Sequence, residues 1–351
     1  MVSEEQVRSE LNRVLIPGVK RSLVMMNYVR SVVIGDGKIE IALAATGLNE
    51  SIQDWVGSKV KDLVSKIPGV TDVQVTFAIV KPVDLNQVKN IVAVMSGKGG
   101  VGKSLVASLI AVALNRRGDE VGILDADITG PSIPTIFGTR EMPAGGETGI
   151  LPVLSRSGIE IMSFNLLLPN EEDAVIWRGP LISRAVSQFW EDVVWGKLDY
   201  LVVDMPPGTA DVPLTVMQTL PLSGVIIVFT PQDLTAMIVK KAVNMARKMD
   251  KPILGVVENM SYLYLPEINK RFEVFGRSKG EEMAHVANAS LLGQLPIDPE
   301  LAKLCDQGNI EAYTSDAFTE VSRSLAAILP QPPTIGDKSR GVIKECYSLR
   351  D

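Results

Sequence analysis

The sequence of 351 residues is poor in cysteine and histidine, and it has no long apolar run. Its two cysteines, Cys305 and Cys346, lie far apart, so they exclude a disulfide framework and fit a reducing compartment. No segment reaches the roughly 18 apolar residues that a membrane-spanning helix needs. The first residues carry charges from Glu4 onward and lack the apolar core of a signal peptide. These absences predict a cytoplasmic protein that does not span a membrane.

Basic residues are not in excess either, because 35 Lys and Arg stand against 41 Asp and Glu, a net charge of −6. A chain without an overall basic field is a poor match for nucleic acid. Its last residues, GVIKECYSLRD, are too few and too mixed for an amphipathic membrane helix. We therefore expect neither a nucleic-acid partner nor a membrane partner.

The length of the chain indicates two domains, because it exceeds the ordinary size of one compact domain. Residues 1–80 show helical and strand periodicity in the order helix, strand, helix, strand, which predicts a small α+β domain. Residues 81–90 contain Pro and polar residues that interrupt both periodicities, as in a linker. Residues 91–329 are expected to form the main domain, and the Pro- and Gly-rich residues 330–351 a flexible tail.

Continuous apolar strands alternate with helical stretches in the main domain, as in residues 103–117 and 233–249. Strands that are apolar on both faces and separated by helices indicate a parallel sheet covered on both sides. The predicted fold class is therefore α/β with a doubly wound, mostly parallel sheet, whose ligands bind at the carboxyl ends of the strands. The predicted strands cover residues 91–95, 121–124, 201–203, 225–229 and 253–257.

A glycine-rich segment, GKGGVGKS, follows the first of these strands and begins the first long helical stretch. It matches G-x-x-x-x-G-K-[ST], in which backbone N–H groups and the helix N-terminus surround a phosphate. Lys103 would neutralise the β- and γ-phosphates, and Ser104 would offer its hydroxyl to Mg²⁺. A glycine turn without phosphate is the alternative, and it does not account for the Lys-Ser pair. The predicted ATP-binding loop comprises Gly97, Lys98, Gly99, Gly100, Val101, Gly102, Lys103 and Ser104.

Lys98 is a separate signal, because the shape of the loop does not require a lysine after its first glycine. One interpretation is a solvated surface lysine. The other is the signature lysine of the deviant Walker A class, which reaches across a dimer interface to the nucleotide of the partner.

Acidic residues follow two further buried strands. Asp125 and Asp127 come after residues 121–124, and Asp204 ends the strand at residues 201–203. Each aspartate alone could be a helix cap or a turn residue. Together with the loop, Asp204 is predicted to hold Mg²⁺ through water, and Asp127 to orient the attacking water. Gly208 is predicted to let the backbone approach the γ-phosphate.

Several segments resemble the Mrp/ApbC family of P-loop ATPases, which is related to MinD and ParA and is associated with carrying iron–sulfur clusters. The resemblance covers roughly residues 89–329, and residues 1–80 resemble, more weakly, the small domain that precedes the ATPase in many Mrp proteins. The segments that carry it are SGKGGVGKS, LDADITGPSIP, IWRGP, WGKLDYLVVDMPPGTAD, TPQDL and GVVENMSY.

The resemblance implies a homodimer that encloses two ATP molecules, with Lys98 as the signature lysine beside Lys103 and Asp127 in the catalytic set. It also implies adenine recognition by Asn259 and by the LPID segment, which contains Pro296 and Asp298. Asn259 alone could equally be a turn residue, although its amide suits the edge of a purine.

The chain departs from the family where a cluster would bind. Members that carry a cluster place a C-x-x-C pair after the Asn-Met-Ser-Tyr segment, and those two positions here hold Leu265 and Ile268. The small domain also lacks a thiol in ALAATGLNESI, where relatives usually have a cysteine. Leu105 replaces the usual hydroxyl residue at the α-phosphate, which removes one hydrogen bond of about 0.5–1.5 kcal/mol.

The two remaining thiols are poor substitutes for the missing cluster ligands. Cys305 lies in a predicted amphipathic helix, where a buried structural cysteine is the ordinary case. Cys346 lies near the C-terminus, and a bridging cluster on two copies of it is the less favoured alternative. His285 is the one histidine, and a lone histidine on a helix is usually a packed or surface residue.

The predicted function is that of an Mrp-type ATPase that uses ATP and Mg²⁺ in iron–sulfur cluster assembly or in transfer to client proteins. The sequence leaves both possibilities open, that the chain binds a cluster itself and that it does not. The alternative is an ATP-switched regulatory or positioning ATPase of the MinD/ParA kind that binds no cluster.

Overall fold

The computed structural model describes residues 2–128, 130–167, 179–209, 211–232 and 235–329. The predicted tail at residues 330–351 lies outside the described residues. Eight strands form the main sheet, and they are β4 (Gln87–Met95), β5 (Val121–Asp125), β8 (Val153–Leu154), β9 (Glu160–Ser163), β10 (Lys197–Asp204), β11 (Gly224–Phe229), β12 (Ile253–Glu258) and β15 (Ser290–Gln294).

The strand order of the main sheet is β15-β12-β11-β4-β10-β5-β9-β8. Every neighbouring pair is parallel except β8 and β9. β5 and β11 are buried along their whole length, as expected for strands covered on both faces. The predicted α/β class with a doubly wound, mostly parallel sheet is confirmed.

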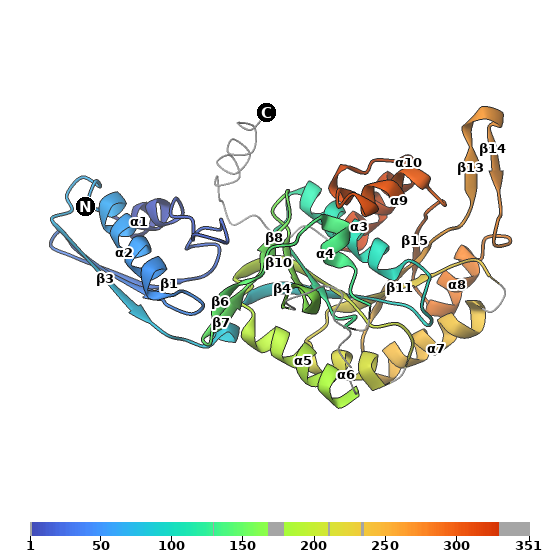
Figure 1. The fold of residues 1–351 in the computed structure, drawn as a ribbon, viewed down its shortest axis with the longest axis horizontal. Coiled ribbons are helices and arrows are strands. Elements are labelled where there is room, and N and C mark those ends of the chain that lie inside the picture. Colours follow the sequence, from blue (N-terminus) through green and yellow to red (C-terminus); the bar gives the residue numbers. More distant parts are fainter. Residues whose placement is uncertain (1, 129, 168–178, 210, 233–234, 330–351) are drawn as a thin grey trace.

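Helices cover both faces of this sheet in two layers (Figure 1). Their apolar sides pack on the sheet, and each fully buried aliphatic side chain contributes about 1.5–3 kcal/mol to stability. One layer contains α3 (Lys103–Arg117), α4 (Ile133–Phe137), α9 (Pro299–Asp306) and α10 (Asp316–Ile328). The other contains α5 (Gly179–Asp192), α6 (Asp211–Thr219), α7 (Thr235–Lys248) and α8 (Gly280–Ala287).

The order of the central strands determines where a ligand can bind. β4 and β5 are joined through α3, yet β10 lies between them in the sheet. The carboxyl ends of these three neighbouring strands therefore meet at one edge, which is the usual binding position in open α/β sheets.

Residues 2–80, called the N-terminal unit, form a separate three-stranded sheet in the order β1-β2-β3. β1 is antiparallel to β2, and β3 is parallel to it. The elements of the unit are α1 (Glu4–Leu11), β1 (Val29–Gly35), β2 (Lys38–Ala44), α2 (Glu50–Val64) and β3 (Asp72–Ala78). The predicted order of helix, strand, helix, strand missed β1. Only Val29 of this edge strand is buried, and the adjacent Val32 and Val33 break the alternation.

The segment predicted to be a linker contains more regular structure than expected. A 3-10 helix, η1, spans Pro82–Asp84, and β4 begins at Gln87, four residues before its predicted start. The first half of β4 is only partly buried and pairs with β10 on one side, so its apolar signal begins at Ile91.

Short elements absent from the prediction complete the described chain. β9 and β15 are only four and five residues long, and β15 contains polar residues and a glycine, so their apolar signal is weak. No helix of the described residues is long and apolar enough to cross a membrane. The remaining short elements are β6 (Ala144–Gly146), β7 (Gly149–Leu151), η2 (Phe164–Leu167), β13 (Leu263–Leu265), η3 (Pro266–Ile268), β14 (Lys270–Phe272) and η4 (Ile310–Ala312).

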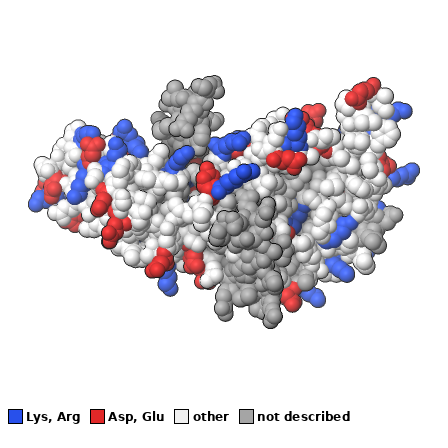
Figure 2. Space-filling view, viewed as in Figure 1, with Lys and Arg blue, Asp and Glu red and all other residues white. Residues whose placement is uncertain are grey.

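The N-terminal unit packs directly on the rest of the chain. Leu151 and Val194 are part of its hydrophobic core, although they belong to the larger part of the chain. The N–H of Lys197 donates to the carbonyl of Met25 at 2.8 Å, and Asn27 Nδ2 donates to the carbonyl of Leu85 at 2.9 Å. On the face shown in Figure 2, basic and acidic side chains are interspersed over both parts.

Candidate nucleotide-binding site

The loop between β4 and α3 has glycine where neighbouring atoms leave no room for a side chain. A Cβ atom at Gly97 would lie 2.2 Å from Ile238 Cγ2 and 2.5 Å from the Ile238 carbonyl oxygen. Gly102 has φ 77°, and a Cβ there would lie 2.1 Å from Asn259 Nδ2. No side chain caps the N-terminus of α3. The loop therefore presents uncapped amides and the positive end of a helix dipole, which is a favourable place for an anion.

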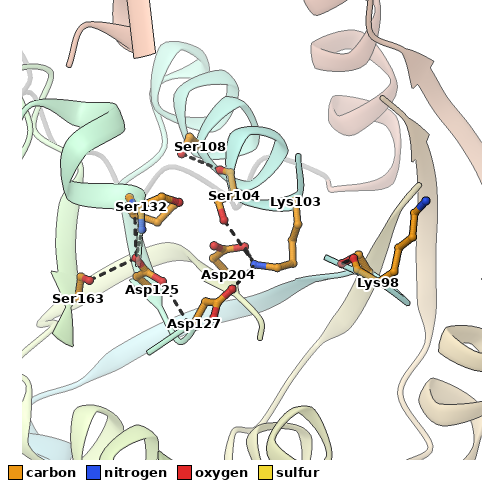
Figure 3. Close-up of polar contacts among 11 residues, drawn as sticks. Lys98, Lys103, Ser104, Ser108, Asp125, Asp127, Ser132, Ser163 and Asp204 are labelled. Carbon is orange, nitrogen blue, oxygen red and sulfur yellow. Dashed lines mark hydrogen bonds and ion pairs between the residues drawn. The ribbon is translucent and has the colours of Figure 1, made fainter. Parts of the chain in front are cut away.

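A buried cluster of one lysine and two aspartates lies beside this loop (Figure 3). Lys103 Nζ is 2.6 Å from Asp204 Oδ1 and 3.6 Å from Asp127 Oδ2. Lys103 Nζ also donates to Ser104 Oγ at 3.4 Å. The structure thus brings together four residues that the sequence predicted for phosphate and metal binding.

Asp204 has the properties of a carboxylate that assists metal binding. It is fully buried, and its Oδ2 has no hydrogen-bond partner among the described residues. Burial raises the pKa of Asp204, although the nearby Lys103 ammonium lowers it. A buried oxygen without a partner is rare and often marks the place of an ion or water. The donor set of this oxygen and the Ser104 hydroxyl fits Mg²⁺, which prefers oxygen ligands, phosphates and water.

No group of three or more His, Cys, Asp or Glu side chains able to hold a metal occurs in the part of the chain that the structure describes. A Mg²⁺ ion at this site would therefore depend on phosphate oxygens and water for most of its ligands.

Asp125 organises the loop that carries Asp127. Its Oδ1 accepts the N–H of Asp127 at 3.2 Å, and its Oδ2 accepts the N–H groups of Ser132 and Ile133 at 3.1 and 3.2 Å. Ser163 Oγ donates to the same Oδ2 at 3.2 Å. Burial raises the pKa of Asp125 to about 8, and the neighbouring carboxylate of Asp204 acts in the same direction. The sequence placed Asp125 next to the site but did not reveal this role, because its partners lie up to 38 residues away.

Lys98 is separate from the buried cluster. Figure 3 shows its side chain directed away from Lys103 and the aspartates. Its Nζ donates to Gln232 Oε1. Gln232 was not among the predicted site residues, although it belongs to the TPQDL segment that contributed to the resemblance.

Asn259 lies against the glycine loop. Its side chain is buried, and Nδ2 donates to the carbonyl of Val101 at 2.9 Å. Gly208 also contacts the loop, because its N–H donates to the carbonyl of Ser96 at 3.0 Å. Both residues therefore lie at the predicted site.

The LPID segment and Leu105 have structural contacts of their own. Asp298 caps α9 by accepting the N–H groups of Glu300 and Leu301, and it accepts the hydroxyl of Tyr313 at 2.7 Å. Pro296 is partly buried in the segment between β15 and α9. Leu105 is partly buried and packs against the hydrophobic core beside α3.

The two positions that the resemblance assigns to cysteines lie on a hairpin formed by β13 and β14. Leu265 ends β13, and Ile268 is 54% exposed in η3. This hairpin extends away from the main sheet (Figure 1). Burial raises the pKa of Cys305 to about 11, so its thiol is protonated and is a poor metal ligand at neutral pH. Cys346 lies outside the described residues.

Comparisons with known proteins agree with this geometry. A family model described as NUBPL iron-transfer P-loop NTPase matches residues 87–331, and one described as iron-sulfur cluster assembly protein matches residues 4–77. An iron-sulfur cluster carrier protein of Clostridium perfringens is 46% identical over 237 residues, which cover 65% of this chain and 83% of the relative. A protein of the same name from Synechocystis sp. is 36% identical over 344 residues, which cover 94% of this chain and 97% of the relative.

Solved structures show the same fold. A nucleotide-binding protein of Archaeoglobus fulgidus, solved in complex with ADP, has 45% identity and a TM-score of 0.59, and the match covers 66% of this chain and 91% of that one. The cell division ATPase MinD of Pyrococcus furiosus has 19% identity and a TM-score of 0.50, and the match covers 68% of this chain and 99% of that one. The second likeness concerns the fold alone.

Proposed function

Since the chain belongs to the NUBPL iron-transfer P-loop NTPase family, we propose that it hydrolyses Mg-ATP slowly and serves the assembly or transfer of iron–sulfur clusters. The resemblance read from the sequence is thereby confirmed at the level of the family. The similar protein from Archaeoglobus fulgidus was solved in complex with ADP. The relatives of this chain from Clostridium perfringens and Synechocystis sp. are named iron-sulfur cluster carrier proteins. We propose that this work takes place in the cytoplasm, for which the scarcity of cysteine is the support.

One observation supports the nucleotide site above all others. A buried lysine lies between two carboxylates at the N-terminus of a helix, next to amides that no side chain caps. A triphosphate can take the place of a carboxylate beside Lys103, and the Mg²⁺ that accompanies it pairs with the carboxylate that Lys103 gives up, so no buried charge is left without a partner.

Each residue then has a distinct task. Lys103 and the amides of the loop bind the β- and γ-phosphates, and Ser104 and Asp204 hold Mg²⁺, which supplies further neutralisation of charge on the phosphate oxygens. Asp127 accepts a hydrogen bond from the attacking water and orients it toward the γ-phosphorus. The bond to the leaving oxygen of ADP breaks as the bond from water forms. Such transfer depends on positioning and charge neutralisation more than on a strong base.

We further propose that Asn259 and the LPID segment form the adenine side of the site. Asn259 lies against the glycine loop, so its carbonyl oxygen is well placed to accept from a purine. The carboxylate of Asp298 already accepts from three donors. Asp298 therefore shapes this segment, and the backbone beside Pro296 contacts the base.

Lys98 supports a homodimer. Its ammonium lies outside the cluster of its own chain, and Gln232 holds it there. A lysine in this position is available to the nucleotide of a second copy, as the resemblance implied. Mixing a Lys98→Ala chain with a Lys103→Ala chain tests this proposal, because partial recovery of ATPase activity requires the two chains to share a site.

A second candidate function is favoured by the hairpin of β13 and β14. Leu265 and Ile268 offer no sulfur, and Ile268 is 54% exposed, together with Tyr264 at 44% and Phe272 at 44%. A regulatory ATPase that changes conformation with ATP and binds no cluster would have these features, and exposed apolar groups often contact partners.

Anaerobic reconstitution with iron and sulfide separates the two candidates. A carrier that binds its own cluster gains visible absorbance, and Cys346→Ser removes it while Cys305→Ser does not. A colourless protein that hydrolyses ATP indicates the regulatory function. The double variant Leu265→Cys, Ile268→Cys is the positive control, because it restores the C-x-x-C spacing at the family position.

A further inference from the structure

Arg21 is a buried arginine that extends from the N-terminal unit into the larger part of the chain, and it is only 4% exposed. Its Nη1 donates to Glu120 Oε2 at 2.6 Å, and its Nε donates to Glu160 Oε1 at 2.8 Å. The guanidinium thus joins two carboxylates that lie 40 positions apart in the sequence. Arginine suits this task because its planar group presents several donors in fixed directions.

These two carboxylates stand at the beginning of two neighbouring parallel strands. Glu120 immediately precedes β5, and Glu160 is the first residue of β9. The strands pair in parallel with Gly122 opposite Glu160 and Asp125 opposite Ser163. Both strands therefore run from Arg21 toward the nucleotide site, over roughly 16 Å from Glu120 to Asp125 and roughly 10 Å from Glu160 to Ser163 at the usual rise per residue.

The same two strands are also joined at their other end, where the site begins. Ser163 Oγ donates to Asp125 Oδ2 at 3.2 Å, and Asp125 Oδ1 accepts the N–H of Asp127 at 3.2 Å. Asp127 in turn lies 3.6 Å from Lys103. A continuous series of polar contacts and paired strands leads from Arg21 to the catalytic aspartate.

We propose that Arg21 is a positioning residue for ATP hydrolysis, because its bridge between Glu120 and Glu160 fixes β5 against β9 and so fixes Asp125 and Asp127. The N-terminal unit then helps to position the catalytic residues. A partner that displaces this unit slows ATP hydrolysis. The inference rests on the proposed ATPase function and adds a source of control within the chain.

Stability alone gives little reason for such a bridge. A buried ion pair is often no more stabilising than apolar residues of similar volume. A bridge that connects two strands leading to an active site has a further use, since small shifts along packed strands change the position of the groups at their ends.

Steady-state kinetics of full-length variants test the inference. Arg21→Met and Ser163→Ala are each expected to lower kcat by about three- to tenfold, with the KM for ATP changed less than about twofold. The loop and Lys103 still bind the phosphates in both variants, so ATP binding is retained while the orientation of Asp127 is lost. The double variant is expected to equal the more severe single variant, because both changes interrupt one pathway.

Two further variants keep the result interpretable. Asn27→Gly removes another hydrogen bond between the units without touching β5 or β9, and it is expected to leave kcat unchanged. Arg21→Lys retains one charge and one contact, so an intermediate kcat is expected. This variant replaces Arg21→Met in the test if Arg21→Met fails to fold. Thermal unfolding of each variant confirms the folded state.

The outcomes separate the two proposals. A wild-type protein without ATPase activity overturns the proposed hydrolysis. An active wild type with an unchanged kcat in Arg21→Met, or with effects of Arg21→Met and Ser163→Ala that simply multiply, overturns the role of Arg21 alone. A loss of kcat in Asn27→Gly equal to that in Arg21→Met also overturns it, because contact between the units in general would then be responsible.

Discussion

Two carboxylates of the nucleotide site perform different tasks although both are buried at strand ends. Asp125 has its oxygens occupied by three backbone N–H groups and a hydroxyl. Asp204 has one oxygen paired with Lys103 and the other without a partner among the described residues. The first arrangement fixes a loop, and the second leaves a ligand for a metal or its water.

Asp204→Asn therefore separates metal assistance from phosphate binding. We expect ATPase activity to fall by about 100-fold, because charge stabilisation at the transferring phosphoryl group is lost. ADP should still bind, but Mg²⁺ should no longer strengthen its binding. Calorimetric titration with ADP, with and without Mg²⁺, measures both effects. Asp62→Asn, a change at an exposed ion pair of the N-terminal unit, is the matched control, and an equal Mg²⁺ effect in both variants would contradict the role of Asp204.

Residues that a local motif singles out lie together in the structure. Lys103, Ser104 and Asp204, which follow from the glycine loop and from a strand that ends in an aspartate, are in mutual contact through the Lys103 ammonium. The contact between Lys98 and Gln232 joins residues 134 positions apart, so no local pattern contains it. The role of Asp125 was hidden for the same reason.

At the level of elements, capping residues fix where two helices begin. Asp298 caps α9 by accepting two backbone N–H groups of that helix, and Ser315 caps α10 by accepting the N–H of Phe318. The LPID segment ends at Asp298, so the cap also fixes the residues that precede the helix.

Asp298→Ala and Ser315→Ala are each expected to lower the free energy of unfolding by about 1 kcal/mol, the usual effect of losing a cap. Only Asp298→Ala should also weaken ADP binding, because it disturbs the segment proposed to contact the base. Urea denaturation and fluorescence titration measure the two quantities. Equal ADP affinity in the two variants would argue against an adenine contact from this segment.

Elements with strong periodicity were predicted closely, and weak ones were missed. α3 begins and ends at the predicted residues, because its apolar positions lie between two glycine-bounded turns. β1 and β9 escaped prediction, since the first is an exposed edge strand and the second has four residues. Their positions depend on neighbours that only the folded chain supplies.

At the scale of the whole molecule, the two units are joined by a charged contact within a largely apolar interface. Arg21 and Glu160 are both buried there, and nothing in the local sequence around either residue indicates the pairing. The periodicity of the sequence therefore could not predict how the two units contact each other, although it predicted that there are two units.

The pH dependence of stability should report the burial of the Glu160 carboxyl at this contact. Burial raises the pKa of Glu160 from 4.5 to about 7, although the Arg21 guanidinium opposes the change and Glu120 supports it. The native state holds this proton more tightly than the unfolded chain, so the contribution of Glu160 is complete below about pH 4.5 and is lost as the pH rises through about 7. The change is on the order of 3 kcal/mol.

Glu160→Gln removes the titrating proton while keeping the shape of the side chain. We expect the free energy of unfolding of the wild type, relative to this variant, to fall between pH 4.5 and pH 7.5. Urea denaturation at a series of pH values provides the measurement. Parallel curves for the two proteins would show that Glu160 has an ordinary pKa.

Calorimetric titration of the purified protein with Mg-ADP, compared with Lys103→Ala, tests the nucleotide site most directly. We predict saturable binding of about one nucleotide per chain in the wild type and at least about a hundredfold weaker binding in the variant, because one buried ammonium neutralises the phosphates. Lys66→Ala, which removes a lysine from an exposed ion pair, should bind as the wild type does. Absence of binding in the wild type, or equal binding in Lys103→Ala, would contradict the assignment of this loop as a nucleotide site.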